Sequence, residues 1–523
     1  MITLLDYGAG NVRSVINAIE KIGEGVKLVT SPKDINEAYR LVFPGVGSFG
    51  NMMETLKEKG YLHALRKYVA DNRPFLGICL GLQALFEVSE EAPGVQGLGI
   101  FKGSVKRFST GLSIPHIGWN GLKFNKPSSL FAGLRGNEKF YFVHSFHVAP
   151  EEGDIVLTTT DYGYEFTSSI QKGQVTATQF HPEKSGEAGL KVLENFIKDK
   201  TEKIVPEVRP ASTRLAKRIV ACLDVRTNDR GDLVVTKGDQ YDVREKGEVR
   251  NLGKPVDLAR RYYEEGADEI TFLNITGFRD FPLKDMPMLE VLRRTSLEVF
   301  VPLTIGGGIR DYTDSDGRHY SALEVASAYF RSGADKVSIG SDAVFICEQV
   351  LEKGPTGASS IETISRVYGN QAVVISIDPR RVYVKDPGDT RHVVMKTRHP
   401  GPGGEKYCWY QCTIKGGREG RDIDAVTLAK IVEDLGAGEI LLNCIDRDGT
   451  NLGFDIELIK AVAEAVSIPV IASSGAGSAE HFLEVFLHTD VEAALAAGIF
   501  HREEVAIEEV KTHLHKHGVE IRK

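Results

Sequence analysis

The stretch KRIVACLDVR, residues 217–226, returns later in the chain in a related form, QAVVISIDPR, residues 371–380. Each copy is a short apolar run that ends in an aspartate, Asp224 in the first and Asp378 in the second. Three further blocks recur in the same order at an offset of roughly 150 to 170 residues, a period longer than that of solenoid repeats. They pair residues 266–277 with 436–449, 301–310 with 468–477, and 333–343 with 490–500.

The recurring blocks decide the fold of the second part of the chain. Each is a continuous apolar run preceded by a helix-like stretch, which is typical of buried parallel strands. Two matching sets of strands predict an α/β fold with a (β/α)8 TIM barrel over residues 214–523. A doubly wound open sheet is the alternative, but glycine-rich ends after alternate strands favour a closed barrel.

Residues 1–200 predict a separate α/β domain, because short apolar strands alternate there with helical segments. The segment TEKIVPEVRPAST, residues 201–213, is polar, carries two prolines and shows no periodicity. We interpret it as the linker between the two domains.

The most informative motif of the first domain is PFLGICLGLQ, residues 74–83. An apolar strand runs into Cys79, glycines lie on both sides of it, and a helix-like run follows. Such a nucleophile elbow holds the side chain at a helix N-terminus, where the dipole lowers a thiol pKa and backbone N–H groups can receive an oxyanion. Downstream, TATQFHPEKS supplies His181 and Glu183, so the three side chains predict a thiol acyl-transfer triad.

Acidic and glycine-rich residues stand where the predicted barrel strands end, the part of such barrels that carries active sites. Asp224, Asp378 and Asp446 end the first, fifth and sixth strands, and carboxylates at one mouth indicate proton transfer. Capping a helix or holding a loop is the alternative role for each. The glycine-rich ends predict two phosphate sites, because bare backbone N–H groups beside a helix N-terminus bind anions. They are Gly306, Gly307, Gly308, Gly340 and Ser341 in one half, and Gly475, Gly477, Ala497 and Gly498 in the other.

Charged residues begin several barrel strands at the opposite, N-terminal end. Arg218 has the same parity as Asp224 along its strand, so if one points into the barrel, both do. Charged side chains that point into the barrel cost free energy unless they form ion pairs. A salt-bridge ring at the barrel floor therefore suggests a function, and a gate is one candidate. Ordinary surface ion pairs are the alternative. The residues concerned are Arg218, Glu269, Lys336 and Glu439.

The composition argues against several other classes of protein. With 523 residues, 42% hydrophobic and 26% charged, the chain is typical of a globular protein of two to four domains. A net charge of −8 gives no excess of basic residues for binding nucleic-acid phosphates, so we expect no nucleic-acid partner. Six scattered cysteines lack the spacing of a zinc site and indicate a reducing compartment without a bound metal. We expect no membrane span and a cytoplasmic location, or a plastid one if a transit peptide was trimmed.

Together these motifs resemble a known family, the bifunctional imidazole glycerol phosphate synthases of histidine biosynthesis, and the likeness spans essentially the whole chain. Three motifs are similar to its class-I glutamine amidotransferase domain, which is flavodoxin-like: PGVGSFG (44–50), GICLGLQ (77–83) and QFHPEKS (179–185). Four are similar to its cyclase barrel: ACLDVR (221–226), IGGGIR (305–310), NCIDRDG (443–449) and SSGAG (473–477).

For the first domain, the resemblance implies a glutaminase. Cys79 would be the nucleophile, His181 the base and Glu183 the residue that orients the base. Backbone N–H groups would form an oxyanion hole. One of the peptide groups must rotate before its N–H can complete this hole. The resemblance makes Leu80 a donor of this hole and Val46 the peptide that rotates. It implies that glutamine is bound by Gly47, Gln83, His144, Ser145 and Phe146.

For the barrel, the resemblance implies that Asp224 and Asp446 act as general acid and base on a bisphosphorylated ribulosyl-formimino aminoimidazole carboxamide ribotide. Ammonia would attack its keto carbon, and cleavage would release imidazole glycerol phosphate and aminoimidazole carboxamide ribotide, without a cofactor. Lys237 resembles a mobile lysine that closes over this substrate. The glutaminase would dock intramolecularly over the barrel floor in a monomer, with Lys184 facing the interface and the floor ring gating an ammonia channel.

Some positions depart from the family's commoner pattern: Asn274, the Ser473–Ser474 pair, Gly498 and a polar excursion over residues 382–421 that resembles an insertion of fused eukaryotic forms. Rival interpretations also stand beside the resemblance. A different synthase barrel, such as one making pyridoxal phosphate, predicts a Schiff-base lysine at a strand end. An inactive metabolite-binding scaffold has no need of two catalytic sets, and a glutaminase with a purely structural barrel has no need of phosphate loops.

Overall fold

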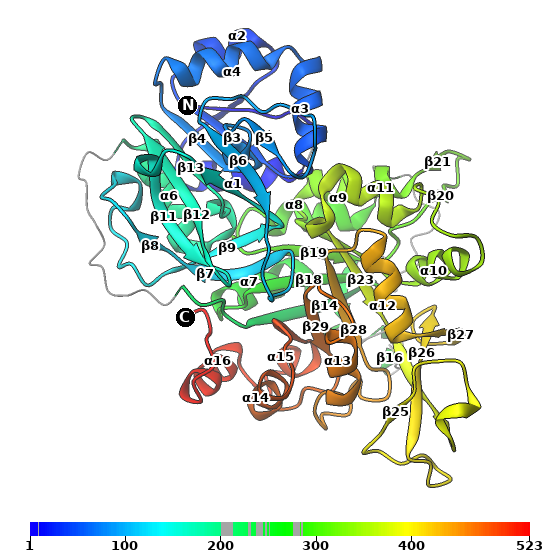
Figure 1. Cartoon of the computed structure of the whole chain (residues 1–523). Coiled ribbons are helices and arrows are strands. Elements are labelled where there is room, and N and C mark those ends of the chain that lie inside the picture. Colours follow the sequence, from blue (N-terminus) through cyan, green and yellow to red (C-terminus); the bar gives the residue numbers. More distant parts are fainter. Residues whose placement is uncertain are drawn as a thin grey trace.

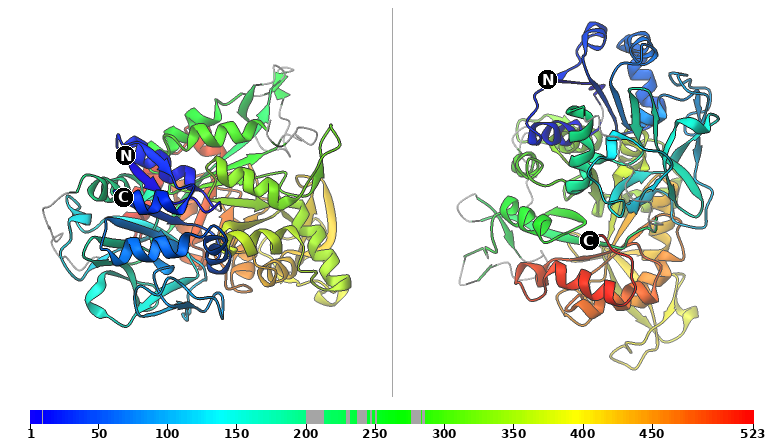
Figure 2. Two further views of the ribbon diagram at one scale, coloured as in Figure 1. Left: turned by 90° about the horizontal axis from the view of Figure 1, so that it is seen from above. Right: turned by 90° about the vertical axis from the view of Figure 1, so that its left-hand side faces the viewer.

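The computed structural model of the chain describes residues 1–8, 10–199, 213–228, 232–236, 244–245, 248–249, 251–275, 283 and 286–523. Two α/β bodies are stacked on one another, the N-terminal one above the C-terminal one in the view of Figure 1. The two rotated views in Figure 2 show the same stacking from above and from the side. Among the described residues, no helix combines the length and the apolar character that crossing a bilayer requires.

The N-terminal body is built on one eight-stranded sheet with the order β2-β1-β3-β4-β13-β12-β11-β8. Its central strands are parallel, and the last three pair antiparallel. In sheet order the strands are β2 (Val26–Leu28), β1 (Ile2–Leu4), β3 (Leu41–Gly45), β4 (Phe75–Cys79), β13 (Val175–Thr178), β12 (Glu165–Lys172), β11 (Val156–Asp161) and β8 (Lys123–Phe124).

Alternation along the buried strands creates a core on each face of this sheet. Val42 of β3 packs with the helices α1 (Val12–Lys21) and α6 (Gly186–Ile197), whereas its neighbours in sequence face the other side. There Phe43 packs with α3 (Phe49–Glu58) and α4 (Tyr61–Ala70). The smaller strands β7 (His116–Gly121) and β9 (Lys139–His144) pair antiparallel beside the main sheet.

The C-terminal body is a closed barrel of eight parallel strands, and the open-sheet alternative is wrong. The order is β14-β18-β19-β22-β23-β28-β29-β30, and pairing of Arg218 with Ala493 joins the first strand to the last. The strands are β14 (Arg218–Thr227), β18 (Glu269–Asn274), β19 (Leu303–Gly306), β22 (Lys336–Ile339), β23 (Val373–Ile377), β28 (Glu439–Asn443), β29 (Val470–Ser473) and β30 (Ala493–Ala496).

Helices surround the barrel: α7 (Pro255–Glu264), α8 (Pro287–Thr295), α9 (Ala322–Ser332), α10 (Ser341–Lys353), α11 (Ser360–Tyr368), α12 (Ala425–Asp434), α13 (Ile456–Ala463), α14 (Ala479–His488), α15 (Gly498–His501) and α16 (Ile507–Lys516). Inside, Val220 and Cys222 of β14 pack with small and branched side chains of β23, β28, β29 and β30. Since side chains alternate along a strand, Arg218, at the start of β14, and Asp224, three residues before its end, face the interior, with the shared parity that the sequence predicts.

The polar excursion after the fifth barrel strand forms a small antiparallel sheet. It contains β24 (Pro379–Val384), β25 (Met395–Lys396), β26 (Tyr407–Ile414) and β27 (Glu419–Asp424), with β26 in the middle. In Figure 1 its outer part extends at the lower right, at the end of the barrel away from the N-terminal body.

The N-terminal body covers the opposite end, where the barrel strands begin. Asn11 Nδ2 donates to Gly333 O at 2.9 Å, just before β22. The Trp119 indole N–H donates to Asp268 O at 3.1 Å, just before β18. The first body therefore closes the barrel floor and leaves the mouth to the loops.

Candidate active sites

The sharp turn at Cys79 is built by close backbone packing. Cys79 ends β4 with φ +53°, a left-handed value that is unusual for a residue with a side chain, and the short helix α5 (Leu80–Gln83) follows at once. A Cβ atom on Gly81 would lie 2.0 Å from Phe43 O, so only glycine fits there. The strained turn holds the thiol at the start of a helix, as expected for a nucleophile elbow.

His181 and Glu183 lie next to this thiol. His181 Nδ1 is 2.8 Å from Glu183 Oε1, and both side chains are buried. Burial opposes a charged imidazole, but Glu183 and a hydrogen bond with Cys79 outweigh it and raise the pKa of His181 well above its usual value. The geometry therefore favours an imidazolium beside the sulfur, an arrangement suited to a thiolate nucleophile.

Only part of the predicted glutamine site lines the cavity at Cys79. Val46, Gly47 and Leu80 do so, together with His181. Gln83 lies behind it, where its amide donates to Phe146 O at 2.9 Å. The hydroxyl of Ser145 donates to Asn370 Oδ1 of the barrel at 3.2 Å, so this side chain faces the interface.

Val46 is held by a tyrosine that the sequence interpretation missed. The Val46 N–H donates to the Tyr7 hydroxyl at 3.1 Å, and that hydroxyl donates to Val46 O at 2.6 Å. In this conformation the Val46 N–H is engaged by Tyr7 and is not available to an oxyanion. A tyrosine directly after an aspartate, Asp6, in an N-terminal loop carries no recognisable signal of this contact.

The barrel floor forms the far wall of the Cys79 cavity. Asp335, Lys336, Gln371 and Ala372 line it together with the triad residues. Lys184, as expected, lies at this interface, where its ammonium is 2.7 Å from Asp335 Oδ2. One cavity thus reaches from the nucleophile to a member of the predicted floor ring.

That ring is present as a closed set of ion pairs. Arg218 pairs with Glu269 at 2.8 Å and with Glu439, and Lys336 pairs with Glu269 at 2.7 Å and with Glu439 at 2.5 Å. None of these side chains is exposed to solvent. Burial disfavours their charges, but Lys336 and Arg218 together lower the pKa of Glu269. The surface-ion-pair alternative is therefore wrong.

Two cavities lie at the barrel mouth, one in each half. The first contains Gly306, Gly307, Gly308, Gly340 and Ser341 of the predicted phosphate loops, and also Asp378. Burial raises the pKa of Asp378, against the effect of hydrogen bonds from Asn443 and Ser376. The sequence interpretation missed three basic residues of this cavity, of which the last two come from the turn between β26 and β27: Arg310, Lys415 and Arg418.

The second cavity contains Asp224 and the other predicted loop residues Gly475, Ala497 and Gly498. Gly477 is not among its lining residues, because its N–H turns to His481 Nδ1 at 3.0 Å. Lys237 lies outside the described residues.

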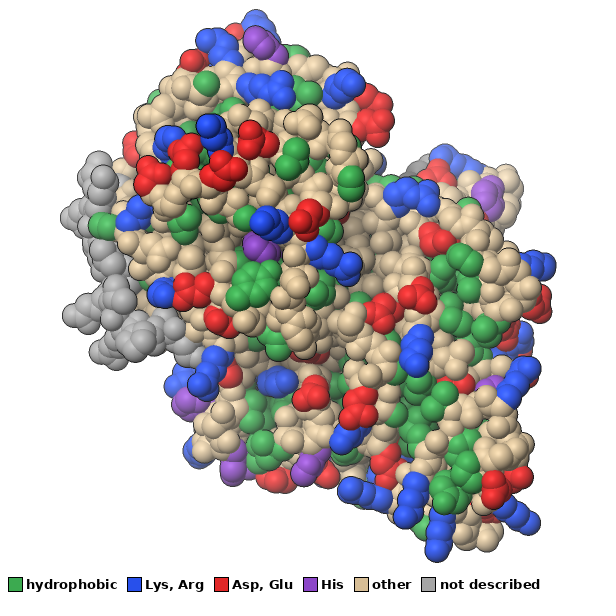
Figure 3. Space-filling view, in the orientation of Figure 1, with side chains coloured by type: hydrophobic (Ala, Val, Ile, Leu, Met, Phe, Trp, Pro, Cys, Tyr) green, Lys and Arg blue, Asp and Glu red, His purple; other side chains and the backbone are tan. Residues whose placement is uncertain are grey.

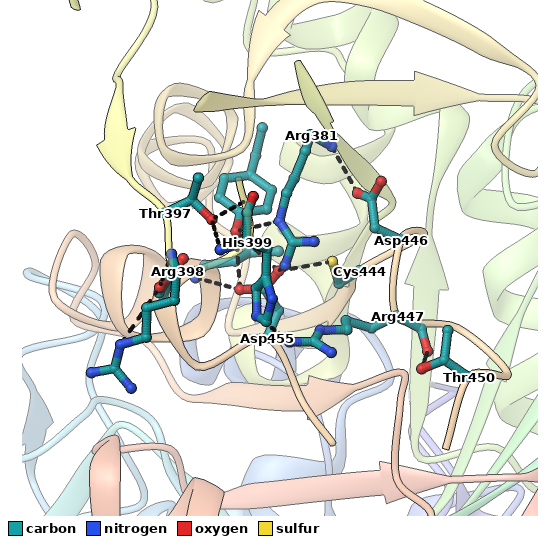
Figure 4. A network of polar contacts seen from close by, with 12 residues as sticks. Arg381, Thr397, Arg398, His399, Cys444, Asp446, Arg447, Thr450 and Asp455 are labelled. Atoms are coloured by element: carbon teal, nitrogen blue, oxygen red, sulfur yellow. Dashed lines mark hydrogen bonds and ion pairs between the residues drawn. The ribbon is translucent and has the colours of Figure 1, made fainter. Parts of the chain in front are cut away.

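Asp446 is placed differently from what the sequence suggests. It lines neither mouth cavity, and its carboxylate instead accepts a hydrogen bond from the Arg381 backbone N–H at 2.8 Å (Figure 4). Asp448, two residues later, shares the second cavity with Asp224. The sequence interpretation passed over Asp448, although the motif NCIDRDG contains both aspartates.

Comparison with known proteins agrees with this two-site geometry. Residues 3–200 match the model of class-I glutamine amidotransferases, and residues 218–506 match a family described as histidine biosynthesis protein. An Arabidopsis thaliana protein named imidazole glycerol phosphate synthase hisHF, chloroplastic, is 60% identical over all of this chain and 89% of its own. The Schizosaccharomyces pombe hisHF protein is 55% identical, and the match covers both chains completely.

The chain belongs to the imidazole glycerol phosphate synthase family. Like these fused synthases, it joins a glutaminase domain to a cyclase domain of the barrel type. A free-standing relative, the imidazole glycerol phosphate synthase subunit HisF of Methanopyrus kandleri, is 44% identical over 308 residues, which is 59% of this chain and 98% of that one.

Proposed function

We propose that the N-terminal domain releases ammonia from glutamine and that the barrel uses it to make imidazole glycerol phosphate. The observation that carries this proposal is the cavity between the domains, which is lined by Cys79 and His181 on one side and by Lys336 of the barrel floor on the other. The domains would span residues 1–200 and 214–523, with 201–213 as the linker.

In the glutaminase step, the Cys79 thiolate attacks the side-chain amide carbon of glutamine. His181 gives its proton to the leaving nitrogen, so ammonia departs and a thioester remains, which water then hydrolyses. Glu183 keeps His181 oriented and charged before the attack. The oxyanion is received by the N–H of Leu80 and by that of Val46 once it leaves Tyr7.

Ammonia then passes the floor ring into the barrel. A route inside the protein keeps it neutral and away from bulk water. The ring of Arg218, Glu269, Lys336 and Glu439 must part for it, because its side chains close the interior at this level. The strong mutual pairing of these charges makes the closed state the resting one.

At the mouth, Asp224 and a second carboxylate act as the acid and base pair on the bisphosphorylated ribulosyl-formimino ribotide. Asp378 and Asp446, which the sequence predicts, are the candidates for the second carboxylate, and of these two Asp378 lines a mouth cavity. Asp378, with a raised pKa, is placed to hold or return a proton beside the first cavity. The two glycine-rich cavities hold the two phosphates, and Arg310, Lys415 and Arg418 supply positive charge to one of them.

Charge elsewhere on the molecule does not suggest a nucleic-acid partner. Figure 3 shows acidic and basic side chains interspersed over the face in view. We propose that the protein works as a monomer in the cytoplasm or, like the relative named as chloroplastic, in a plastid.

The test is glutamine hydrolysis by the purified protein with and without the bisphosphorylated substrate, with imidazole glycerol phosphate followed in the same reaction. We expect the substrate to stimulate hydrolysis and product to form in step with glutamate. Cys79→Ala should abolish the glutamine-dependent reaction and keep the ammonia-dependent one. Hydrolysis that ignores the substrate, with no imidazole product from either nitrogen source, would remove the cyclase assignment.

A further inference from the structure

The thiol of Cys79 has a second buried polar neighbour besides His181. The side-chain amide of Gln179, directly after β13, donates to Cys79 Sγ at 3.4 Å. Gln179 is fully buried, and its backbone N–H donates to Ser168 O of β12 at 2.8 Å, which fixes the residue beside the sulfur. The glutaminase step as described above makes no use of this contact.

The direction of the Gln179 amide is set by its other neighbour, Gln83. A carbonyl oxygen can only accept a hydrogen bond, so Gln83 must turn its NH2 group toward Phe146 O, which lies 2.9 Å away. The same NH2 group donates to Gln179 Oε1 at 3.2 Å. Because the oxygen of Gln179 is engaged there, this residue presents its own NH2 group to the sulfur.

Two buried histidines hold the Phe146 carbonyl in turn. His144 Nδ1 is 2.7 Å from this carbonyl, so the ring carries its proton on Nδ1 and donates it there. Its Nε2 then accepts from His116 Nδ1 at 3.3 Å. Burial lowers the pKa of His144 to about 3 and that of His116 well below its ordinary value, so both rings are neutral near pH 7. The carbonyl that orients Gln83 is therefore fixed from its other side.

We propose that Gln179 is a catalytic residue of the glutaminase, a hydrogen-bond donor that stabilises the Cys79 thiolate. Gln83 is the positioning residue that turns this donor toward the sulfur. A hydrogen bond to an ionised acceptor is roughly twice as strong as one between neutral groups, so the Gln179 amide favours the thiolate over the thiol. It acts before the attack on glutamine and again when water releases the sulfur from the thioester. The inference rests on the proposed function, because it refines that step.

Alkylation of Cys79 by iodoacetamide tests this donor in the absence of glutamine, because the thiolate is the reactive form. Gln179→Met places an apolar side chain of similar length beside the sulfur. Its alkylation rate at pH 7 should fall about tenfold, and the midpoint of the pH profile should move to higher pH. Gln83→Met should shift the profile in the same direction but less, since the donor stays and only its orientation is freed. Peptide mass spectrometry locates the label, and Cys79→Ala gives the background.

Glutamine hydrolysis provides the second arm. The kcat of Gln179→Met should fall about tenfold to a hundredfold, the range expected for a hydrogen bond to a charged group, while KM changes little. Ammonia-dependent synthesis should equal that of the wild type, because the barrel mouth is untouched. Gln174→Met is the matched control, since this glutamine directly precedes β13 but is exposed. It should behave like the wild type in both assays.

Gln179→Asn keeps the inference testable if the methionine variant fails to fold. It retains the amide but is one methylene shorter, so the donor withdraws from the sulfur and the shift of the alkylation profile to higher pH should recur. If the folded Gln179 variants are alkylated with the pH profile of the wild type, Gln179 only fills space and the inference is overturned. A wild type that hydrolyses no glutamine would count against the proposed function, whereas the alkylation comparison would still decide the role of Gln179.

Discussion

The Tyr7 hydroxyl engages both backbone polar groups of Val46, the residue proposed to supply an oxyanion-hole donor. A Cβ on Gly10 would lie 2.5 Å from Val46 Cβ, so the loop that carries Tyr7 packs directly against this residue. Turning the Val46 N–H toward Cys79 requires breaking the contacts with Tyr7. The tyrosine therefore favours the resting state of the glutaminase.

Removing the Tyr7 hydroxyl tests whether it holds Val46 in the resting orientation. Tyr7→Phe should raise glutamine hydrolysis in the absence of the barrel substrate by about tenfold, since each hydrogen bond contributes about 1 kcal/mol net. The rate with substrate bound should change much less. Tyr39→Phe is a suitable control because its ring is 71% exposed. An unchanged basal rate in Tyr7→Phe would show that the orientation of Val46 does not limit hydrolysis.

The two aspartates of NCIDRDG show where sequence reasoning reached its limit at this scale. Strand alternation predicts the direction of Arg218 and Asp224 because both belong to one regular strand, β14. Asp446 and Asp448 follow the end of β28, so alternation no longer applies to them. The direction of Asp446 depends on Arg381, 65 residues earlier, whose position only the folded chain defines.

At the scale of elements, the helix α3 begins three residues after Val46, and a partly buried acid holds its start. Glu91 accepts the N–H of Phe49, the first residue of α3, at 3.0 Å. Burial raises the pKa of Glu91 to about 7, against the effect of this hydrogen bond. The carboxyl thus titrates near neutral pH at the start of α3, close in sequence to Val46.

The sign of the resulting pH dependence follows from linkage. Between the ordinary pKa of a glutamate and about 7, the folded protein binds more protons at Glu91 than the unfolded chain, so this group lowers stability as the pH rises. Glu91→Gln should therefore gain free energy of unfolding relative to the wild type between pH 5 and pH 8, by about 2 kcal/mol. Urea denaturation at both pH values measures it.

Glu58→Gln, at the exposed last residue of the same helix, serves as the control and should track the wild type. If the free energy of unfolding changes with pH equally in Glu91→Gln and in the wild type, Glu91 has the ordinary pKa of a glutamate in the folded protein.

Most elements were predictable because their apolar patterns are long and repeated. The repeat of KRIVACLDVR indicated eight barrel strands, and PFLGICLGLQ indicated the strand and helix around Cys79. The phosphate-loop glycines were partly predictable: Gly475 lines a cavity, but Gly477 turns its N–H to His481. Lys415 and Arg418 were missed because the excursion has no periodicity that would place its turn at the mouth.

At the scale of the whole molecule, the two domains meet at a polar interface in which Asp335 contacts both. Its carboxylate accepts from Asn11 at 2.8 Å and pairs with Lys184, while its own chain leads directly into Lys336 of the ring. The same residue thus contacts the glutaminase domain and adjoins the floor ring.

Asp335→Ala should separate the two activities. It leaves the buried Lys184 ammonium without its partner, so glutamine-dependent synthesis should fall at least about tenfold. Ammonia-dependent synthesis should be unaffected, because the mouth is at the other end of the barrel. Asp316→Ala, at an exposed acid of the same body, provides the control. An equal loss with both nitrogen sources would indicate general damage to the barrel and no specific role in coupling.

The shared pairing in the floor ring also constrains how the chain can evolve. Each carboxylate serves two cations and each cation serves two carboxylates, so a change at any one position strands a buried charge at a cost of about 3–5 kcal/mol. No single substitution among the four is therefore neutral, and escape requires several simultaneous changes. Related proteins should therefore retain all four ring residues together, even where the surrounding sequence diverges. These residues are Arg218, Glu269, Lys336 and Glu439.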